Sequence, residues 1–281
     1  MSKPKLHFAH ANSYPAGVYR QFFELLSPHF EIQSLDMHGH DPRYPVTDCW
    51  PQLVDEYIEQ LTSRYDEPVV LLGHSLGGML SLLVARARPD LVRCVVMLDA
   101  PVVAGWRAWF WRLIKVTGLA HSVPPAKFSL KRRNVWPDAD SAYQHFASKA
   151  LFAAWGPGVL QDYMDSGLKP HPDGVQLRFT RETETAIYST LPHHLGGVLR
   201  GAFPVPVGFI GGTTSWETSQ SGLGHTQALV GRHFRMIEGG HLFPMESPAL
   251  AAQVSNEMIA ALLAEAAVAS PKKLLAGRHF A

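Results

Sequence analysis

Six short apolar runs recur along the chain, and they constrain its fold more than any other feature. They cover residues 6–9, 32–35, 69–72, 94–98, 207–210 and 234–237. Strands of a parallel sheet are covered on both faces and therefore read as nearly continuous apolar runs. Helical patterns lie between the runs, as at 76–88, and a last one follows at 248–267. This order predicts an α/β fold, with a mostly parallel central sheet flanked by helices.

The segment 101–201 interrupts this alternation. It holds Trp106, Trp109, Trp111, Trp136 and Trp155 but no apolar run of the same quality. A crossover helix takes only about 10–15 residues, so a segment of this length indicates an insertion. We predict a helical cap with helices near 106–116, 141–155 and 183–191. The core then comprises 1–100 and 202–270, and residues 271–281 form a loose tail.

The composition excludes several classes of protein. The 281 residues include 25 Lys and Arg against 24 Asp and Glu, so a net charge of +1 gives no reason to expect a nucleic-acid partner. No stretch is apolar over the roughly 18 residues that a membrane span needs, and the amino terminus does not read as a secretion signal. Two cysteines cannot form a disulfide framework. We expect a cytoplasmic protein without stable membrane insertion, and the sequence leaves its oligomeric state open.

The motif Gly73-His74-Ser75-Leu76-Gly77 directly follows the run 69–72 and opens a helix. In this context G-x-S-x-G forms a tight turn that exposes the serine hydroxyl, and side chains at the two flanking glycines would collide. The first N–H groups of the helix have no partner within it, so the N–H of Leu76 can bind an oxyanion. We predict Ser75 as the nucleophile. The alternative is a glycine-rich turn that only packs the strand on the helix.

A nucleophilic serine needs a base, and the base needs an acid to orient it. His241 follows the run 234–237 and two glycines near the end of the core. Two carboxylates are candidates for the acid: Asp99 at the end of the run 94–98, and Glu217 after the run 207–210. We favour Asp99 because it stands directly at a strand end. The alternatives are a helix-capping role for His241 and a turn-forming role for Asp99.

The turn after the first run, His10-Ala11-Asn12, contains small residues and faces the same edge of the sheet as Leu76. A backbone N–H of Asn12 or Ala11 is therefore predicted to be the second oxyanion donor. We also assign His74, Trp106, Phe110 and Leu242 to the substrate pocket.

His10-Ala11-Asn12, Gly73-His74-Ser75-Leu76-Gly77-Gly78 and Gly240-His241 together resemble the α/β-hydrolase superfamily, with its chain order of serine, acid and histidine. The resemblance implies a serine hydrolase that works through an acyl-enzyme, with no cofactor. Two departures stand out. Ala11 replaces the usual glycine of the His-Gly-x segment, and no acid directly follows the run 207–210. Several members of the superfamily place the acid after the preceding strand, which Asp99 would match.

Three further patterns carry weaker signals. The segment Asp36-Met37-His38-Gly39-His40-Asp41 is rich in metal-ligand types, but its spacing departs from the binuclear pattern, and we expect no metal. The segment 106–116 places Trp106, Trp109 and Phe110 on one helix face, which we predict is buried over the pocket; contact with a lipid interface is the alternative. The run Lys131-Arg132-Arg133 is predicted to be a solvated face, the alternative being a site for an anionic substrate.

The function that this sequence predicts is hydrolysis of a carboxylic ester or lactone in a small, largely apolar acyl substrate. Two alternatives stay open. The same triad serves acyl transfer and hydrolytic carbon–carbon cleavage. A hydrolase scaffold can also bind a ligand without catalysis.

Overall fold

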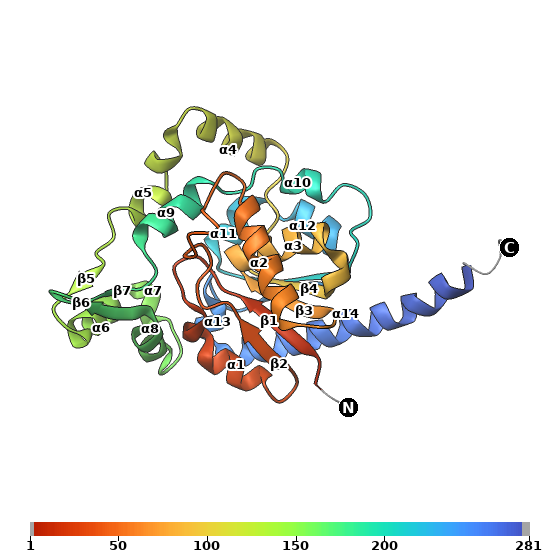
Figure 1. The fold of residues 1–281 in the computed structure, drawn as a ribbon, viewed down its shortest axis with the longest axis horizontal. Helices are drawn as coiled ribbons and strands as arrows, with labels where there is room; N and C mark the ends of the chain where they lie inside the picture. The colour runs from red at the N-terminus through yellow and green to blue at the C-terminus, as the bar shows by residue number, and fades with distance from the viewer. Residues whose placement is uncertain (1–2, 277–281) are drawn as a thin grey trace.

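The computed structural model describes residues 3–276, and within them all six apolar runs form strands of one sheet (Figure 1). The strands are β1 (Lys5–Ala9), β2 (Glu31–Ser34), β3 (Val69–His74), β4 (Val92–Leu98), β8 (Val207–Gly212) and β9 (Phe234–Ile237). Their order is β2-β1-β3-β4-β8-β9, and every neighbouring pair is parallel. The predicted α/β fold with a mostly parallel sheet is confirmed.

Helices cover both faces of this sheet because successive strand residues point to opposite sides. In β3, Val70 and Leu72 belong to one hydrophobic cluster, which also includes residues of α1 (Arg20–Leu26) and α14 (Pro248–Ala276). Val69 and Leu71 belong to a second cluster, shared with α2 (Pro51–Arg64) and α3 (Leu76–Ala87). The sheet is therefore buried between two helical layers, as its continuous apolar strands require.

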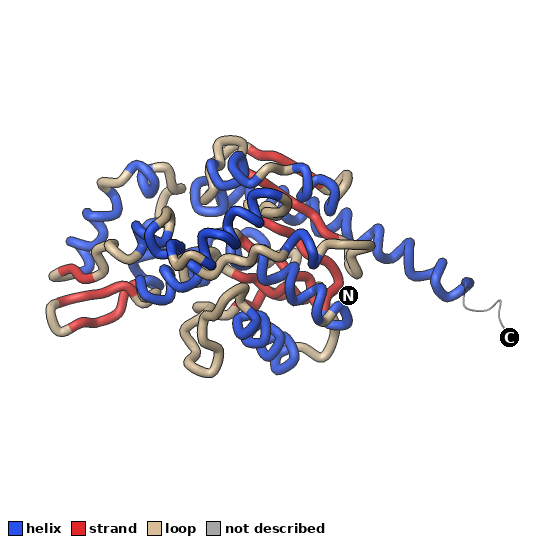
Figure 2. The backbone as a smooth tube through the Cα atoms, turned by 90° about the horizontal axis from the view of Figure 1, so that it is seen from above, coloured by secondary structure: helices blue, strands red, loops and turns tan. Residues whose placement is uncertain are grey.

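The segment between β4 and β8 forms short helices and a second sheet, and Figures 1 and 2 show this second sheet to one side of the main sheet. The helices are α4 (Trp106–Val116), α5 (Ala126–Ser129), α6 (Ala139–Ala147), α7 (Ala150–Ala153), α8 (Val159–Gly167), α9 (Arg181–Ser189) and α10 (Leu195–Val198). The second sheet is antiparallel and has the order β5 (Val135–Trp136), β7 (Gly174–Leu177), β6 (Leu168–His171).

The structure corrects the prediction of a purely helical cap. The expected helix 106–116 is present as α4, but the single helix expected at 141–155 is two helices, α6 and α7. The second sheet was not predicted. Its strands are short, and β6 contains the exposed Lys169 and Pro170, so it lacks the apolar pattern on which the strand predictions relied. The division of the chain into a core and a cap stays a prediction.

The carboxyl-terminal helix also differs from its prediction. α14 begins at Pro248, as expected, but continues to Ala276 rather than ending near 267. Part of the segment expected to be a loose tail is thus helical, and residues 277–281 lie outside the described part of the chain. The alanine-rich stretch from 260 to 269 has a high helix propensity, which favours continuation of the helix beyond 267. Among residues 3–276, no helix is both long enough and apolar enough to span a bilayer.

Candidate active site

Ser75 lies in the tight turn between β3 and α3, with φ 52° and ψ −112°. A Cβ atom at Gly73 would lie 2.3 Å from the carbonyl carbon of Gly77, and one at Gly77 would lie 2.0 Å from the Ala9 oxygen. Both glycines are therefore required by close backbone contacts. The turn leaves Ser75 partly exposed, and α3 starts at the next residue, Leu76.

The structure brings Ser75, His241 and Asp99 together. His241 follows β9, and its Nε2 lies 3.0 Å from the Oγ of Ser75. The His241 Nδ1 lies 2.7 Å from Oδ2 of Asp99, which follows β4. Since a carboxylate only accepts hydrogen bonds, the proton of this bond is on Nδ1, and Nε2 is left to accept from the serine hydroxyl. The result is a continuous hydrogen-bonded chain from hydroxyl to carboxylate.

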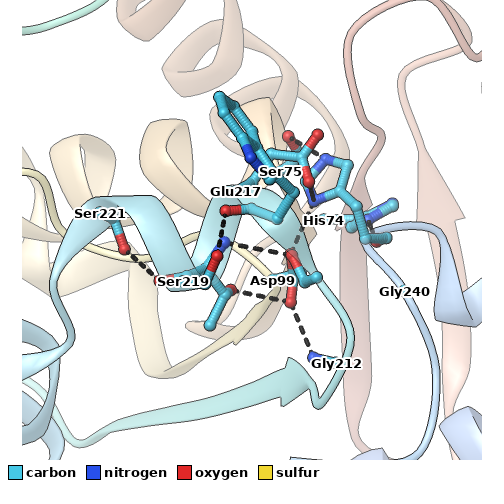
Figure 3. Close-up of polar contacts among 12 residues, drawn as sticks. His74, Ser75, Asp99, Gly212, Glu217, Ser219, Ser221 and Gly240 are labelled. Carbon is cyan, nitrogen blue, oxygen red and sulfur yellow. Dashed lines mark hydrogen bonds and ion pairs between the residues drawn. The ribbon is translucent and has the colours of Figure 1, made fainter.

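The two candidate acids differ in their distance from the His241 imidazole and in burial. Figure 3 shows the polar contacts of Asp99. Asp99 is 1% exposed, and its carboxylate also accepts hydrogen bonds from the Gly212 N–H (2.8 Å), the Ser215 hydroxyl (2.5 Å) and the Thr218 hydroxyl (2.9 Å). Glu217 has a side chain that is 49% exposed, with Oε2 at 3.9 Å from the His241 Nδ1. Asp99 is thus the carboxylate that is hydrogen-bonded to the imidazole.

The loop after β8 supports Asp99 in a way that sequence reasoning missed. It carries no carboxylate before Glu217, but the end of β8, the loop and the start of α11 contribute the three donors to Asp99, from Gly212, Ser215 and Thr218 respectively. The Ser215 hydroxyl also accepts the Thr218 N–H at 3.1 Å, as the N-cap of α11 (Trp216–Ser221). In the sequence, Ser215 could be recognised only as a helix N-cap, which indicates local structure and not a contact with Asp99.

Electrostatics at this site favour a charged pair. Burial disfavours the charged forms of both the His241 imidazole and the Asp99 carboxyl. For His241 this effect is outweighed by the hydrogen bond to Asp99 and by the negative charges of Glu217 and Asp99, which raise its pKa above 6.5. Burial would likewise raise the pKa of Asp99, but the hydrogen bond from His241 and those from Ser215 and Gly212 hold this pKa below 3.8. The carboxylate is therefore ionised whenever the imidazole takes up a proton.

The turn after β1 offers fewer free backbone N–H groups than predicted. The N–H of Ala11 donates to the Tyr19 hydroxyl at 3.1 Å, which argues against Ala11 as an oxyanion donor. Asn12 is buried, and its side-chain amide donates to the Glu184 carbonyl at 3.1 Å. His10 donates from Nδ1 to the Ala11 carbonyl. Asn12 and Leu76 remain the predicted pair of backbone donors.

His74 is fully buried, which contradicts its assignment to the substrate pocket. Its Nε2 donates to the His241 carbonyl at 2.8 Å, and its Nδ1 accepts from the Tyr19 hydroxyl at 2.7 Å. Burial, with repulsion from His241, lowers the pKa of His74 to about 3, so the ring is neutral. Both nitrogens are engaged, and the ring ties the turn that holds Ser75 to the backbone of the His241 loop.

The other residues assigned to the pocket also differ from expectation. Leu242 is 3% exposed and packs in the hydrophobic core. Trp106 and Phe110 on α4 are 68% and 52% exposed. The expectation that α4 buries its aromatic face over a pocket is therefore wrong.

The two imidazoles of the segment 36–41 form polar contacts with other residues of the chain. His38 Nδ1 lies 3.3 Å from Oε2 of Glu56. His40 Nδ1 donates to the His38 carbonyl, and its Nε2 accepts the N–H of Thr180.

The basic run 131–133 also departs from its prediction as a solvated face. Lys131 and Arg133 are exposed as expected. Arg132, however, pairs with the buried Glu184, with Nη2 3.1 Å from Oε2.

Comparison with known proteins gives the family. A profile of the alpha/beta hydrolase family matches residues 8–254. The lipase LipV of Mycobacterium tuberculosis is 38% identical over 81 residues, covering 27% of this chain and 30% of the lipase. A pimeloyl-(acyl-carrier protein) methyl ester esterase of Xanthomonas oryzae is 25% identical over 201 residues, covering 68% of this chain and 64% of the esterase. Each match spans less than two thirds of the relative's own length.

Solved structures share the fold along most of the chain. The structure of E-2-(acetamidomethylene)succinate hydrolase has a TM-score of 0.75 at 20% identity, and 92% of each chain is covered. The enol-lactonase of Burkholderia xenovorans has a TM-score of 0.61 at 16% identity, again with 92% of each chain covered. At such identities the likeness shows the fold alone. Because the family profile matches most of its length, this chain belongs to the alpha/beta hydrolase family.

Proposed function

We propose that this chain is a serine hydrolase that cleaves a carboxylic ester or lactone of a small, largely apolar substrate. The observation that carries the proposal is the hydrogen-bonded chain from the Ser75 Oγ through the His241 imidazole to the Asp99 carboxylate. Residue types in this order serve nucleophilic acyl transfer. The esterase and lipase among the relatives, and the enol-lactonase of the same fold, support the choice of substrate class.

The mechanism follows from the directions of these hydrogen bonds. His241 Nε2 removes the hydroxyl proton as Ser75 Oγ attacks the carbonyl carbon, and Asp99 stabilises the imidazolium that forms. The N–H groups of Leu76 and Asn12 bind the oxyanion of the tetrahedral intermediate. The imidazolium then protonates the leaving alkoxide, and the acyl group stays on Ser75. In deacylation His241 Nε2 removes a proton from a water molecule as the water oxygen attacks the acyl carbon. The imidazolium then returns this proton to Ser75 Oγ as the acyl–serine bond breaks, which releases the acid.

The experiment that tests this proposal uses a fluorophosphonate probe and a panel of p-nitrophenyl esters and lactones. The full chain is expected to be labelled at Ser75, as located by peptide mass spectrometry, and to turn over short-chain esters or lactones. Ser75→Ala is expected to lose both labelling and turnover. Ser219→Ala is a matched control, because Ser219 is an exposed serine of α11 whose hydroxyl donates to the Trp216 carbonyl. Turnover that survives in Ser75→Ala would overturn the proposal, and so would an unlabelled wild-type chain.

A further inference from the structure

Large apolar side chains are concentrated on the outward side of α4 and on the turns after it. Eleven large hydrophobic residues are exposed in the described part of the chain, and eight of them lie between 106 and 130. They are Trp106, Trp109, Phe110, Leu113, Val116, Leu119, Phe128 and Leu130. Figure 1 shows α4 as an outlying helix, away from the central sheet. Exposed apolar groups gathered in this way mark a contact site more often than chance.

The orientation of α4 is fixed by contacts on its inner side. Ala108 is buried, the Trp111 indole N–H donates to the Leu191 carbonyl at 3.2 Å, and Lys115 Nζ donates to the same carbonyl at 2.8 Å. Trp106, Trp109, Phe110, Leu113 and Val116 fall on the other side at helical spacing. We call these five residues the α4 face. The inner contacts hold the α4 face toward solvent.

Positive charge is concentrated in the segment that forms α4 and the turns after it. Residues 101–137 contain seven Lys and Arg and no Asp or Glu, although the whole chain carries a net charge of only +1. Four of these basic residues, Arg112, Lys127, Lys131 and Arg133, are exposed, and we call them the basic rim. A hollow of about 600 Å³ beside α4 is lined by Trp109, Arg112 and Arg200 together with three histidines, and by no acidic residue. An anion is the group that this region attracts.

We propose that the α4 face docks reversibly on an anionic phospholipid surface. An amphipathic helix with aromatic residues on one face and basic residues beside it lies in the plane of a bilayer interface, its apolar side chains at the boundary between headgroups and acyl chains. The basic rim then lies at the depth of the lipid phosphates, and Arg112 and Arg200 line a hollow that can receive one headgroup. A second copy of the chain fits less well, because it would place two basic rims against each other.

The experiment is flotation of the full chain with vesicles of phosphatidylcholine alone or with 30% phosphatidylglycerol. Each basic side chain near an anionic surface strengthens binding about fivefold, so the anionic vesicles are expected to bind at least about tenfold more tightly. Trp109→Ala/Phe110→Ala and Lys127→Gln/Lys131→Gln are each expected to weaken this binding about tenfold or more. Ser75→Ala is expected to bind like the wild type, so this result is independent of the proposed hydrolysis.

Matched controls lie away from α4. Leu25→Ala removes an exposed apolar residue of α1, and Arg86→Gln/Arg93→Gln removes two exposed charges; both are expected to leave binding unchanged. Apart from Ser75→Ala, these variants replace exposed residues, so circular dichroism is expected to show intact folding. Equal binding to the neutral and anionic vesicles, or no binding to either, would overturn the proposal. Dimerisation that depends on Trp109 and Phe110 without vesicle binding would also overturn it and identify the α4 face as an interface between copies.

Discussion

At the scale of single residues, two carboxylates lie near one imidazole but in different surroundings. Asp99 is buried and accepts four hydrogen bonds, from His241, Gly212, Ser215 and Thr218. These donors fix the carboxylate in one orientation before any substrate binds. Glu217 is half exposed, so water screens its charge. The chemistry of the proposed triad should therefore depend on Asp99 far more than on Glu217.

Exchanging each carboxylate for its amide tests this difference. Asp99→Asn is expected to lower kcat about 10⁴-fold, because an amide at this position favours the wrong tautomer of His241. Glu217→Gln removes a screened charge and is expected to change kcat by no more than about fivefold. Initial rates of ester hydrolysis measure both effects, and Glu217→Gln is the matched control. A large loss in Glu217→Gln with little change in Asp99→Asn would show that the acid is misassigned.

The pH dependence of turnover provides a second test at this scale. In the proposed mechanism His241 acts as a base only when it is neutral, and its pKa is raised above 6.5 by Asp99 and Glu217. The acidic limb of kcat/KM is therefore expected to have its midpoint above pH 6.5. In Glu217→Gln this midpoint should move toward lower pH, because a negative charge that favours the imidazolium is gone. Profiles for both proteins between pH 5 and 9 measure the shift. A midpoint below 6.5 in the wild type would contradict the expectation.

A residue of the site could be predicted only where its neighbours in the sequence form a recognisable pattern. Ser75 and His241 stand in short patterns tied to a strand end, so the sequence alone predicts that they approach each other. The hydroxyls of Ser215 and Thr218 and the phenol of Tyr19 act on partners far along the chain. Nothing in the local sequence indicates that Tyr19 accepts the N–H of Ala11, so the sequence alone predicts Ala11 as a possible oxyanion donor.

At the scale of elements, the contact between β1 and α3 determines where Ser75 sits. Gly77 in the first turn of α3 packs directly on the backbone of Ala9 in β1, where an added Cβ would lie 2.0 Å from the carbonyl oxygen. A backbone atom cannot rotate away as a side chain can. Any side chain at this position must therefore displace the strand or the helix, and with it the turn that holds Ser75.

Gly77→Ala is expected to lower the free energy of unfolding by about 1–3 kcal/mol, which is typical of overpacking, and to reduce turnover by displacing Ser75. Gly197→Ala is the matched control. Gly197 lies in α10, a Cβ there meets no atom within 4 Å, and alanine favours the helix, so stability is expected to stay the same or rise slightly. Urea unfolding and ester hydrolysis measure the two effects. A Gly77→Ala protein with wild-type stability and activity would contradict this account of the turn.

Whether a strand or helix could be predicted from the sequence depends on how it is buried. The inner strands β3, β4 and β8 could be predicted because burial on both faces leaves a nearly unbroken apolar run. The edge strands β2 and β9 are only partly buried and carry Gln33 and Arg235, so their signal is weaker. The β6–β7 hairpin could not be predicted, because Lys169 and Pro170 break its pattern. For α4 the spacing indicates a one-sided helix, but spacing does not indicate whether the aromatic side faces protein or solvent. That choice is made by Trp111 and Lys115, whose partners lie in the loop after α9 and in the loop before α2.

At the scale of the whole molecule, buried histidines link stability to pH. His7, His10 and His74 are fully buried, and burial lowers the pKa of each ring well below 6.5. In the unfolded chain these rings regain ordinary pKa values near 6.5. Between the folded and unfolded pKa values the unfolded state binds more protons, so stability is present above pH 6.5 and is lost as the pH falls. His241 has a raised pKa, so its contribution to the free energy of unfolding changes with pH in the opposite direction. It is a single ring, however, and offsets only part of the effect of the three buried rings.

The free energy of unfolding is therefore expected to fall on acidification from pH 6.5, with a slope near pH 5.5 of about 3–4 kcal/mol per pH unit from the three rings. Urea unfolding at pH 7.5, 6.5 and 5.5 measures this slope. His7→Phe removes one buried titrating ring and is expected to reduce the slope by about a third, whatever its effect on stability at pH 7.5. His29→Gln removes an exposed histidine and should leave the slope unchanged. Equal stability at pH 7.5 and 5.5 would mean that the buried rings take up protons in the folded state, which their burial forbids without local opening of the core.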